Sequence, residues 1–198
     1  KGFGTHPHKN MEIISIPLKG KLKHGDSNKN SRTITIGDIQ TMSAGTGIYH
    51  SEMNGSDTEP VEFLQIWVMP EKLNTPPAYQ DYDIRPFLRK NELALIVSPD
   101  GDAPAKMLQQ TWFSIGEIEA GKKIGYHMHQ SHAGVYIFVI EGEVKVDDTV
   151  LSRRDGMGVY DTHSFEFGKP LKRLAHSADG SADVSLLDKN NSKNQRFV

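Results

Sequence analysis

The chain is organised around residues 5–27, THPHKNMEIISIPLKGKLKHGDS, and around a second run, GIYHSE, that follows further along the sequence. In an extended strand, side chains two positions apart point to the same side. His6 and His8 therefore form one same-face pair, and His50 and Glu52 form another. Imidazole and carboxylate groups suit Fe, Mn, Co, Ni, Cu or Zn, and no thiolate takes part because the chain has no cysteine. The sequence predicts a metal site with four ligands, namely His6, His8, His50 and Glu52.

Length and composition bound the kind of protein. At 198 residues, the chain is long enough for one large domain or two small ones. Its 23 basic and 25 acidic residues give no concentrated positive charge, so we expect no direct nucleic-acid partner. The sequence contains no long apolar run, which excludes a transmembrane helix, and no apolar segment of the signal-peptide type. We expect a cytoplasmic protein without a membrane partner.

Short β-rich segments recur along the chain, with glycine and other turn residues between them. Their spacing is typical of an all-β barrel or sandwich, and no segment has the period of a long amphipathic helix. Residues 70–89 hold four prolines and little periodicity, which predicts a linker, and the Asn-rich residues 189–196 predict a polar tail. Besides the segments that carry the ligand pairs, the predicted strands are 11–18, 32–36, 61–69, 94–98, 112–118, 134–141, 143–146, 156–160, 164–167 and 182–187.

The strand after the first histidine pair carries a prediction about the barrel interior. Ile14, Ile16 and Leu18 have the same parity as His6 and His8. If one strand runs unbroken through this segment, these side chains line the interior together with the histidines.

A weak internal repeat relates the two halves of the chain. The HPH motif that begins at His6 is followed by a strand, a glycine turn, a second strand and an acidic-glycine turn, and the HMH motif that begins at His127 is followed by the same order. A tandem repeat of one β-barrel follows from this order. We expect a metal-binding first domain at 1–80 and a second domain at 81–198 that includes the polar tail.

The HPH and HSE motifs, with the segments around them, resemble the pirin family, whose members are two-domain cupins. The resemblance covers residues 5–27, the segment GDIQTMSAGTGIYHSEMN at 37–54, and LQIWVMP with PPAYQ within 64–80. It implies an all-β fold of two tandem cupin barrels, each a double-stranded β-helix or jelly roll. In the family a further segment normally precedes the HPH motif, so the resemblance also implies a first barrel that is truncated at its N-terminus.

Two acids are candidates for the carboxylate role. Glu12 lies four residues after His8, where many cupins outside the pirins place a ligating glutamate, whereas the pirin pattern gives that role to Glu52. Glu12 is then expected to orient a ligand or hold a proton, or to be a buried acid satisfied by backbone donors. His24, beside a turn, is expected to be a solvated imidazole, and we assign it no role.

The second half repeats only part of the metal motif. His127 and His129 form an HxH pair, with His132 and His163 nearby, but no carboxylate occupies the position of the cupin glutamate, near Val135. Pirin-like second domains usually lack a metal. We therefore expect no metal in this barrel, while weak binding of a late transition metal by the HxH pair stays open.

The functional expectation comes from the site and from the family, because cupins host many chemistries. Bacterial pirin-like proteins can act as quercetin 2,3-dioxygenases, and eukaryotic pirin is an iron-binding transcriptional co-regulator. The resemblance therefore implies a dioxygenase that acts on flavonols such as quercetin, with Fe(II) as the expected metal, and with dioxygen and a small aromatic molecule as substrates. The alternative is a non-enzymatic metal-binding protein that regulates or senses redox state through a protein partner.

In the enzymatic hypothesis, Glu52 or Glu12 accepts the proton of the flavonol 3-hydroxyl, so both are candidate catalytic residues. A flat substrate also needs an apolar wall. Candidates for that wall, which are equally compatible with an ordinary core, are Met42, Ile48, Phe63 and Trp67.

Overall fold

The computed structural model of the chain describes residues 1–131, 133–170 and 182–190. These residues form strands β1 to β18 and one short 3-10 helix, so the predicted all-β class is confirmed. The chain folds into two compact units, one made of Lys1–Pro86 with Pro99–Gln110 and the other of Phe87–Ser98 with the described residues from Thr111 to Asn190. The predicted domain boundary after residue 80 stays a prediction.

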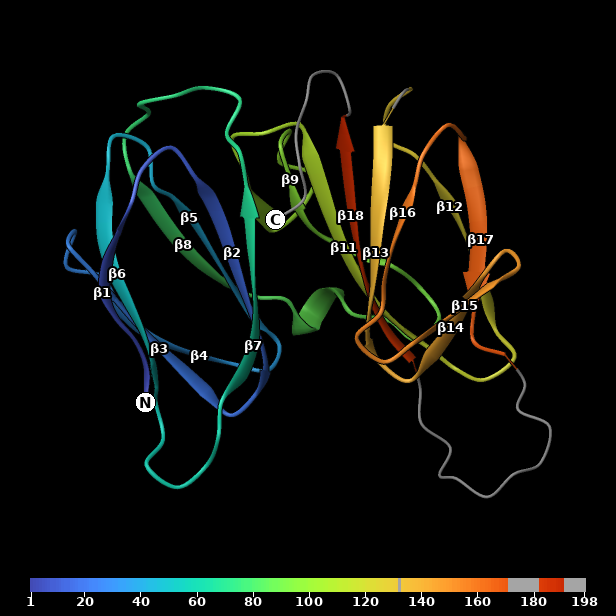
Figure 1. The fold of residues 1–198 in the computed structure, drawn as a ribbon, viewed down its shortest axis with the longest axis horizontal. Helices are drawn as coiled ribbons and strands as arrows, with labels where there is room; N and C mark the ends of the chain where they lie inside the picture. The colour runs from blue at the N-terminus through green and yellow to red at the C-terminus, as the bar shows by residue number, and fades with distance from the viewer. Residues whose placement is uncertain (132, 171–181, 191–198) are drawn as a thin grey trace. The chain divides into compact units, whose positions relative to one another are not determined.

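The first unit consists of two four-stranded antiparallel sheets (Figure 1). Their inner faces are in contact, because the Ser15 hydroxyl on one sheet donates a hydrogen bond to Glu52 on the other. The first sheet has the order β1 (Gly2–His8), β6 (Ile48–Asn54), β3 (Lys21–Asp26) and β4 (Ser31–Thr35). The second sheet has the order β7 (Glu62–Val68), β2 (Glu12–Lys19), β5 (Asp38–Ser43) and β8 (Ala78–Asp83).

The chain reverses between β1 and β2, and this turn changes which side chains face inward. Asn10 takes a φ of 51°, and its amide donates to the Gly45 carbonyl at 2.9 Å. After the turn, Ser15 faces the ligand pairs, whereas Ile14 and Ile16 lie on the opposite face of β2. The predicted unbroken strand, and the shared face predicted for these isoleucines and the histidines, are therefore wrong.

Both faces of β2 are buried, which explains why its sequence is a nearly continuous apolar run. The Ile13 side chain, on the inner face, and the Ile14 side chain, on the outer face, are both fully buried. Burial of both faces makes β2 a central strand of this unit, and it holds the inner residues in a fixed register against β5 and β7.

A glycine turn leads the chain into β6, the strand that carries the second ligand pair. Gly45 takes a φ of +48°, and a Cβ at this position would overlap the carbonyl oxygen of Thr75. The Thr75 carbonyl accepts a hydrogen bond from the Thr46 amide at 2.9 Å. Glycine is needed here for both the left-handed conformation and the close backbone approach.

Three strands of the two sheets of the first unit, β3, β5 and β8, were not predicted. β8 lies inside the segment 70–89 that was expected to be a linker, so that prediction is wrong for these residues. β8 pairs with β5 from Asp38↔Asp83 to Ser43↔Ala78. Proline tracts obscured it in the sequence, because Pro76 and Pro77 directly precede the strand and an edge strand tolerates prolines at its start.

The second unit repeats the arrangement of two sheets, with a core of aliphatic and aromatic side chains between them. One sheet has the order β9 (Ala94–Ser98), β11 (Thr111–Ile118), β18 (Ala182–Asn190), β13 (Ala133–Glu141) and β16 (Gly156–Val159). The other has the order β12 (Lys123–His127), β17 (Ser164–Gly168), β14 (Glu143–Val146) and β15 (Thr149–Ser152). The remaining elements of the described chain are β10 (Ala105–Lys106) and the 3-10 helix η1 (Arg85–Phe87).

The last strand of the second unit extends into the segment that was predicted to be a polar tail. β18 continues to Asn190, so the first two residues of the predicted polar tail belong to a strand, and the rest of that tail lies outside the described residues.

Among the residues that the structure describes, no helix is long and apolar enough to cross a membrane.

Candidate metal centre

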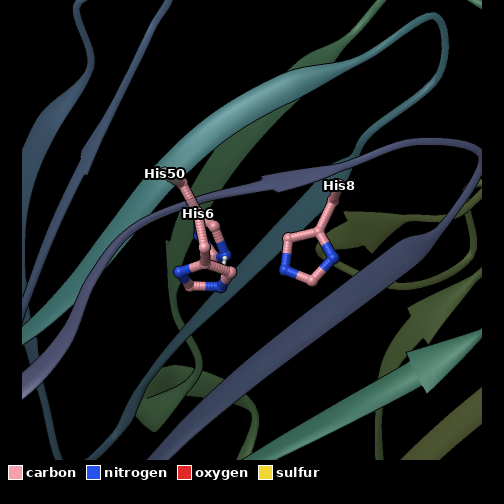
Figure 2. Close-up of side chains that lie close together, drawn as sticks. All are labelled: His6, His8 and His50. Atoms are coloured by element: carbon pink, nitrogen blue, oxygen red, sulfur yellow. Dashed lines mark hydrogen bonds between the residues drawn. The ribbon is translucent and has the colours of Figure 1, made fainter.

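His6, His8 and His50 converge on the inner face of the first sheet (Figure 2). One potential ligand atom from each of the three rings lies within 4.8 Å of the others. The register of the β1–β6 ladder explains the convergence, because His6 stands directly opposite His50 and His8 stands opposite Ile48. Directly opposed residues of an antiparallel pair project to the same face, so three of the four predicted ligands meet.

Hydrogen bonds orient the rings toward a common point. The Nδ1 atom of His6 lies 2.8 Å from the Gly4 carbonyl oxygen, so Nδ1 carries the proton and Nε2 keeps its lone pair. The Nε2 atoms of His6 and His50 are 3.0 Å apart (Figure 2). Among the described residues, the buried Nε2 of His8 has no hydrogen-bond partner. A buried imidazole nitrogen without a partner beside two converging ones fits a metal ion, which would take all three lone pairs.

Burial keeps two of these imidazoles neutral. Desolvation, with a further contribution from the neighbouring imidazoles, lowers the pKa of His50 to about 3. Desolvation and the nearby His6 also lower the pKa of His8. Neutral imidazole is the form that binds a metal, so these rings are ready to bind at neutral pH without losing a proton.

Glu52, the fourth predicted ligand, lies on the same strand and face as His50 but is held by other partners. Its carboxylate is buried, and Oε1 accepts a hydrogen bond from the Ser15 hydroxyl at 2.8 Å. Its Oε2 accepts a hydrogen bond from the Gln65 side-chain amide. The group of ligand atoms within 4.8 Å of one another contains the three imidazoles and not this carboxylate, so ligation by Glu52 stays a prediction.

Glu12 lies away from the histidines. It is on the outer face of β2, opposite Ser43 on β5, and accepts a hydrogen bond from the Ser43 hydroxyl at 2.7 Å. The Leu108 amide is a second donor, at 3.4 Å. Burial raises the pKa of this carboxyl. One donor is a backbone amide, as expected for a buried acid satisfied by backbone donors, and the other is a side-chain hydroxyl. The group of potential metal ligands in the described chain does not contain Glu12, and its role stays a prediction.

His24 is a buried residue that the sequence argument missed. Its side chain is fully buried, so the expectation of a solvated imidazole is wrong. Its ring nitrogens lie 3.2 Å from an Asp26 oxygen and 3.2 Å from the Gln40 amide nitrogen, and the ring stacks on Tyr79 at a centroid distance of 4.6 Å. His24 and Asp26 stand opposite Glu52 and His50 in the β3–β6 ladder. The alternation of Leu22, His24 and Asp26 was the available signal, but the turn residues around it suggested a loop.

The four candidates for the apolar wall divide into two groups. Met42 and Ile48 are buried in a small core cluster, as an ordinary core would have them. Phe63 is half-buried and meets the ring of the exposed Phe3 edge to face. Trp67 is 40% exposed, and its ring contacts the His8 ring at a centroid distance of 5.0 Å. Trp67 therefore combines contact with the histidines and access from outside.

The histidines of the second unit are arranged differently. His127, His129 and His163 are exposed, and His129 stacks on the buried Trp112 at a centroid distance of 4.8 Å. Within the described part of the chain, the group of potential metal ligands contains none of them. His132 lies outside the described residues. The expected lack of metal in this unit stays a prediction.

Comparisons with known proteins agree with the fold and identify the family. Residues 1–68 match the family model named Pirin, and residues 95–171 match the model of the quercetinase C-terminal cupin domain. The quercetin 2,3-dioxygenase of Escherichia coli K12 is 34% identical over 193 residues, which cover 95% of this chain and 76% of that protein. A putative quercetin 2,3-dioxygenase of Mycobacterium tuberculosis is 49% identical over 104 residues, which cover 52% of this chain and 43% of that protein.

Solved structures of pirin proteins have the same fold. The crystal structure of YhhW from Escherichia coli superposes with a TM-score of 0.86 at 32% identity, covering 98% of this chain and 78% of that chain. The structure of bacterial pirin YhhW in complex with nickel(II) superposes with a TM-score of 0.84 at 31% identity, covering 96% of this chain and 77% of that chain. The predicted pair of tandem cupin barrels is confirmed.

Proposed function

This chain belongs to the pirin family, and we propose that it is a metal-dependent dioxygenase of the quercetin 2,3-dioxygenase type whose active centre lies in the first barrel. The observation that carries the proposal is the convergence of three imidazoles, from His6, His8 and His50, on one inner face. Relatives that align with most of the chain bear the name quercetin 2,3-dioxygenase. Site and family therefore support the same activity.

The centre is suited to a divalent metal ion, and we propose Fe(II). We propose that the three imidazoles hold such an ion, with Glu52 as the fourth ligand because it shares the inner face of β6 with His50. When bound, the ion acts as a Lewis acid toward a chelating hydroxyl and carbonyl group and provides positions for substrate and dioxygen. Each carboxylate oxygen of Glu52 accepts one hydrogen bond, from Ser15 or from Gln65, and keeps a further lone pair for a metal ion.

Glu52 is also the group that we propose to accept the proton of the flavonol 3-hydroxyl. Of the two acids predicted for this role, only Glu52 lies on the face that carries the histidines, because Glu12 faces the other side of β2. A general base must be within hydrogen-bond reach of the proton that it removes, and Glu12 does not meet this condition. After Glu52 has accepted this proton, its carboxyl group can donate a hydrogen bond to the Ser15 hydroxyl, which can act as donor or acceptor.

Trp67 provides the face on which we propose that the flat substrate packs. Its indole is partly exposed and contacts His8, so a ring system that reaches the metal also meets the indole. Aromatic pairs prefer offset-stacked or edge-to-face contact, which a flavonol can make with the exposed part of this ring.

Oxygen uptake with quercetin tests the proposed function. Fe(II)-loaded protein should consume oxygen, whereas chelated protein and the Glu52→Gln variant should lose most of the activity, about a hundredfold for loss of a general base. Glu12→Gln is the matched control and should keep it. Equal uptake in all four samples would assign the oxygen consumption to free metal or autoxidation, and the alternative of a non-enzymatic metal-binding regulator would replace the dioxygenase.

A further inference from the structure

A chain of hydrogen bonds links the exposed rim of the first barrel to the buried Glu52. The indole Nε1 of Trp67 donates to the Gln65 Oε1 at 2.9 Å, and the Gln65 Nε2 donates to the Glu52 Oε2. Gln65 stands opposite Ser15 in the β2–β7 ladder, so the two residues that donate to Glu52 are neighbours on the facing sheet. The carboxylate is therefore held from two sides by groups of the second sheet.

The direction of this chain is fixed by the chemistry of its first member. An indole N–H can only donate, so the Gln65 side chain must present its carbonyl oxygen to Trp67. The amide NH2 group is then necessarily the part that faces Glu52. Turning the amide over would place NH2 against the indole N–H and the carbonyl against a carboxylate, and both contacts would be repulsive. Trp67 and Glu52 thus favour the same orientation of the Gln65 amide, and Trp67 fixes its carbonyl end.

We propose that Gln65 is a positioning residue that sets the orientation of the Glu52 carboxylate, and that the indole N–H of Trp67 orients Gln65 for this task. The inference rests on the proposed function of the centre, since Glu52 is its proposed fourth ligand and base. It gives Trp67 a second task beside its aromatic contact with His8. A substrate that packs on the indole then contacts Trp67, the residue that orients Gln65 and, through it, the Glu52 carboxylate.

The two tasks of Trp67 can be separated by substitution. Trp67→Phe keeps an aromatic ring beside His8 but removes the N–H, so the Gln65 side chain loses one of the two hydrogen bonds that fix it and its hold on Glu52 weakens. Gln65→Met keeps the length of the side chain but removes the donor. If the effect of the indole N–H passes through Gln65, then Trp67→Phe changes the centre in the parent protein and changes nothing further in the Gln65→Met background.

Cobalt(II) binding without substrate gives the readout, because the visible absorption of this ion follows the number and geometry of its ligands. We expect Trp67→Phe and Gln65→Met each to weaken Co(II) binding by about tenfold and to alter the spectrum in the same way. In the double variant, the added effect of Trp67→Phe should be less than about twofold. Phe63→Leu, which changes the rim two residues from Gln65 without removing a bond to it, should leave the spectrum unchanged. Additive effects in the double variant, or an unchanged spectrum in Trp67→Phe, would overturn the proposal.

A second measurement needs no metal and covers the case in which a Gln65 variant binds cobalt poorly for other reasons. The chain has two tryptophans, so Trp112→Phe leaves Trp67 as the single fluorophore. In this background Gln65→Met should shift the emission of Trp67, because the indole N–H loses its acceptor, and an unshifted emission would count against the hydrogen-bonded chain. Both readouts are taken without flavonol or oxygen. A protein that passes them but does not consume oxygen would therefore contradict the proposed function and not the positioning role.

Discussion

The Nε2 atoms of His6 and His50 lie 3.0 Å apart, at directly opposed positions of the β1–β6 ladder. Each residue belongs to a different sequence motif, and the pairing of the two strands brings the motifs together. The nearby Nε2 of His8 is buried and has no hydrogen-bond partner among the described residues, so a third imidazole nitrogen is available to bind the same ion. We propose that the first barrel holds an ion at this point, and several measurable consequences follow.

Loss of one imidazole should empty the centre. His50→Ala removes the ring that stands opposite His6, so the affinity for a divalent ion should fall by about a hundredfold or more. Metal content per chain, measured by elemental analysis of protein purified without a chelating tag, is the readout. His127→Ala, an exposed histidine of the second unit, is the matched control. Undiminished metal in His50→Ala would remove the ring from the ligand set.

The second unit should add no tightly held ion. His127 and His129 are exposed and are absent from the group of potential ligands found in the described chain. The stoichiometry should be one tightly bound ion per chain, and it should stay at one in a His127→Ala, His129→Ala double variant. A parent protein with two tightly held ions, reduced to one by these changes, would show that the prediction is wrong.

Glu12 should matter for the pH dependence of stability and not for the metal. Because burial raises its pKa, the folded protein holds this proton more tightly than the unfolded chain does, and folding stability falls as the pH rises through the range just above the ordinary value of 4.5. Glu12→Gln removes this loss, so the variant should gain in the free energy of unfolding, relative to the parent, as the pH rises from about 4 to about 7.

Urea unfolding at several pH values measures this difference, and the retained metal content is recorded in parallel. Glu12→Asp, which keeps the acid but shortens the side chain, is the comparison that retains a titrating group. A Glu12→Gln variant that loses its metal or its oxygen uptake would return Glu12 to the role of a catalytic or ligand-orienting acid.

His24 should contribute to the stability of the first barrel. His24→Leu keeps an apolar body of similar size but leaves the buried Gln40 amide without its ring partner, and it removes one of several partners of Asp26. An unsatisfied buried polar group costs about 1–3 kcal/mol, so the free energy of unfolding should fall by about 2 kcal/mol. Urea unfolding checks this value. An unchanged free energy of unfolding would indicate that a water molecule replaces the hydrogen bond between the His24 ring and Gln40.

The sequence was sufficient for the features that depend on neighbouring positions. The HPH pair and the HSE pair share a face because side chains alternate along a strand, and the three imidazoles do meet. Face assignments across a turn could not be obtained in this way. Asn10 reverses the chain before β2, and the reversal moves Ser15 to the inner face and Glu12 to the outer one.

Contacts between strands far apart in the sequence were also beyond local patterns. Glu52 meets Ser15 and Gln65 because β2 and β7 of one sheet face β6 of the other, and no alternation rule specifies that pairing. His24 was missed for a related reason. Its burial depends on Gln40 and Tyr79 from the facing sheet, whereas the glycine and polar residues beside it suggested an exposed turn.

The most direct test of the central claim compares oxygen consumed with carbon monoxide released when quercetin is the substrate. Ring opening by a 2,3-dioxygenase takes up one dioxygen and expels one carbon monoxide, so Fe(II)-loaded protein should give equal amounts of the two. His50→Ala protein and chelated protein should give neither above the background of free metal. Equal amounts that persist in His50→Ala, or oxygen uptake by the parent without carbon monoxide, would contradict a dioxygenase centre built on these three imidazoles.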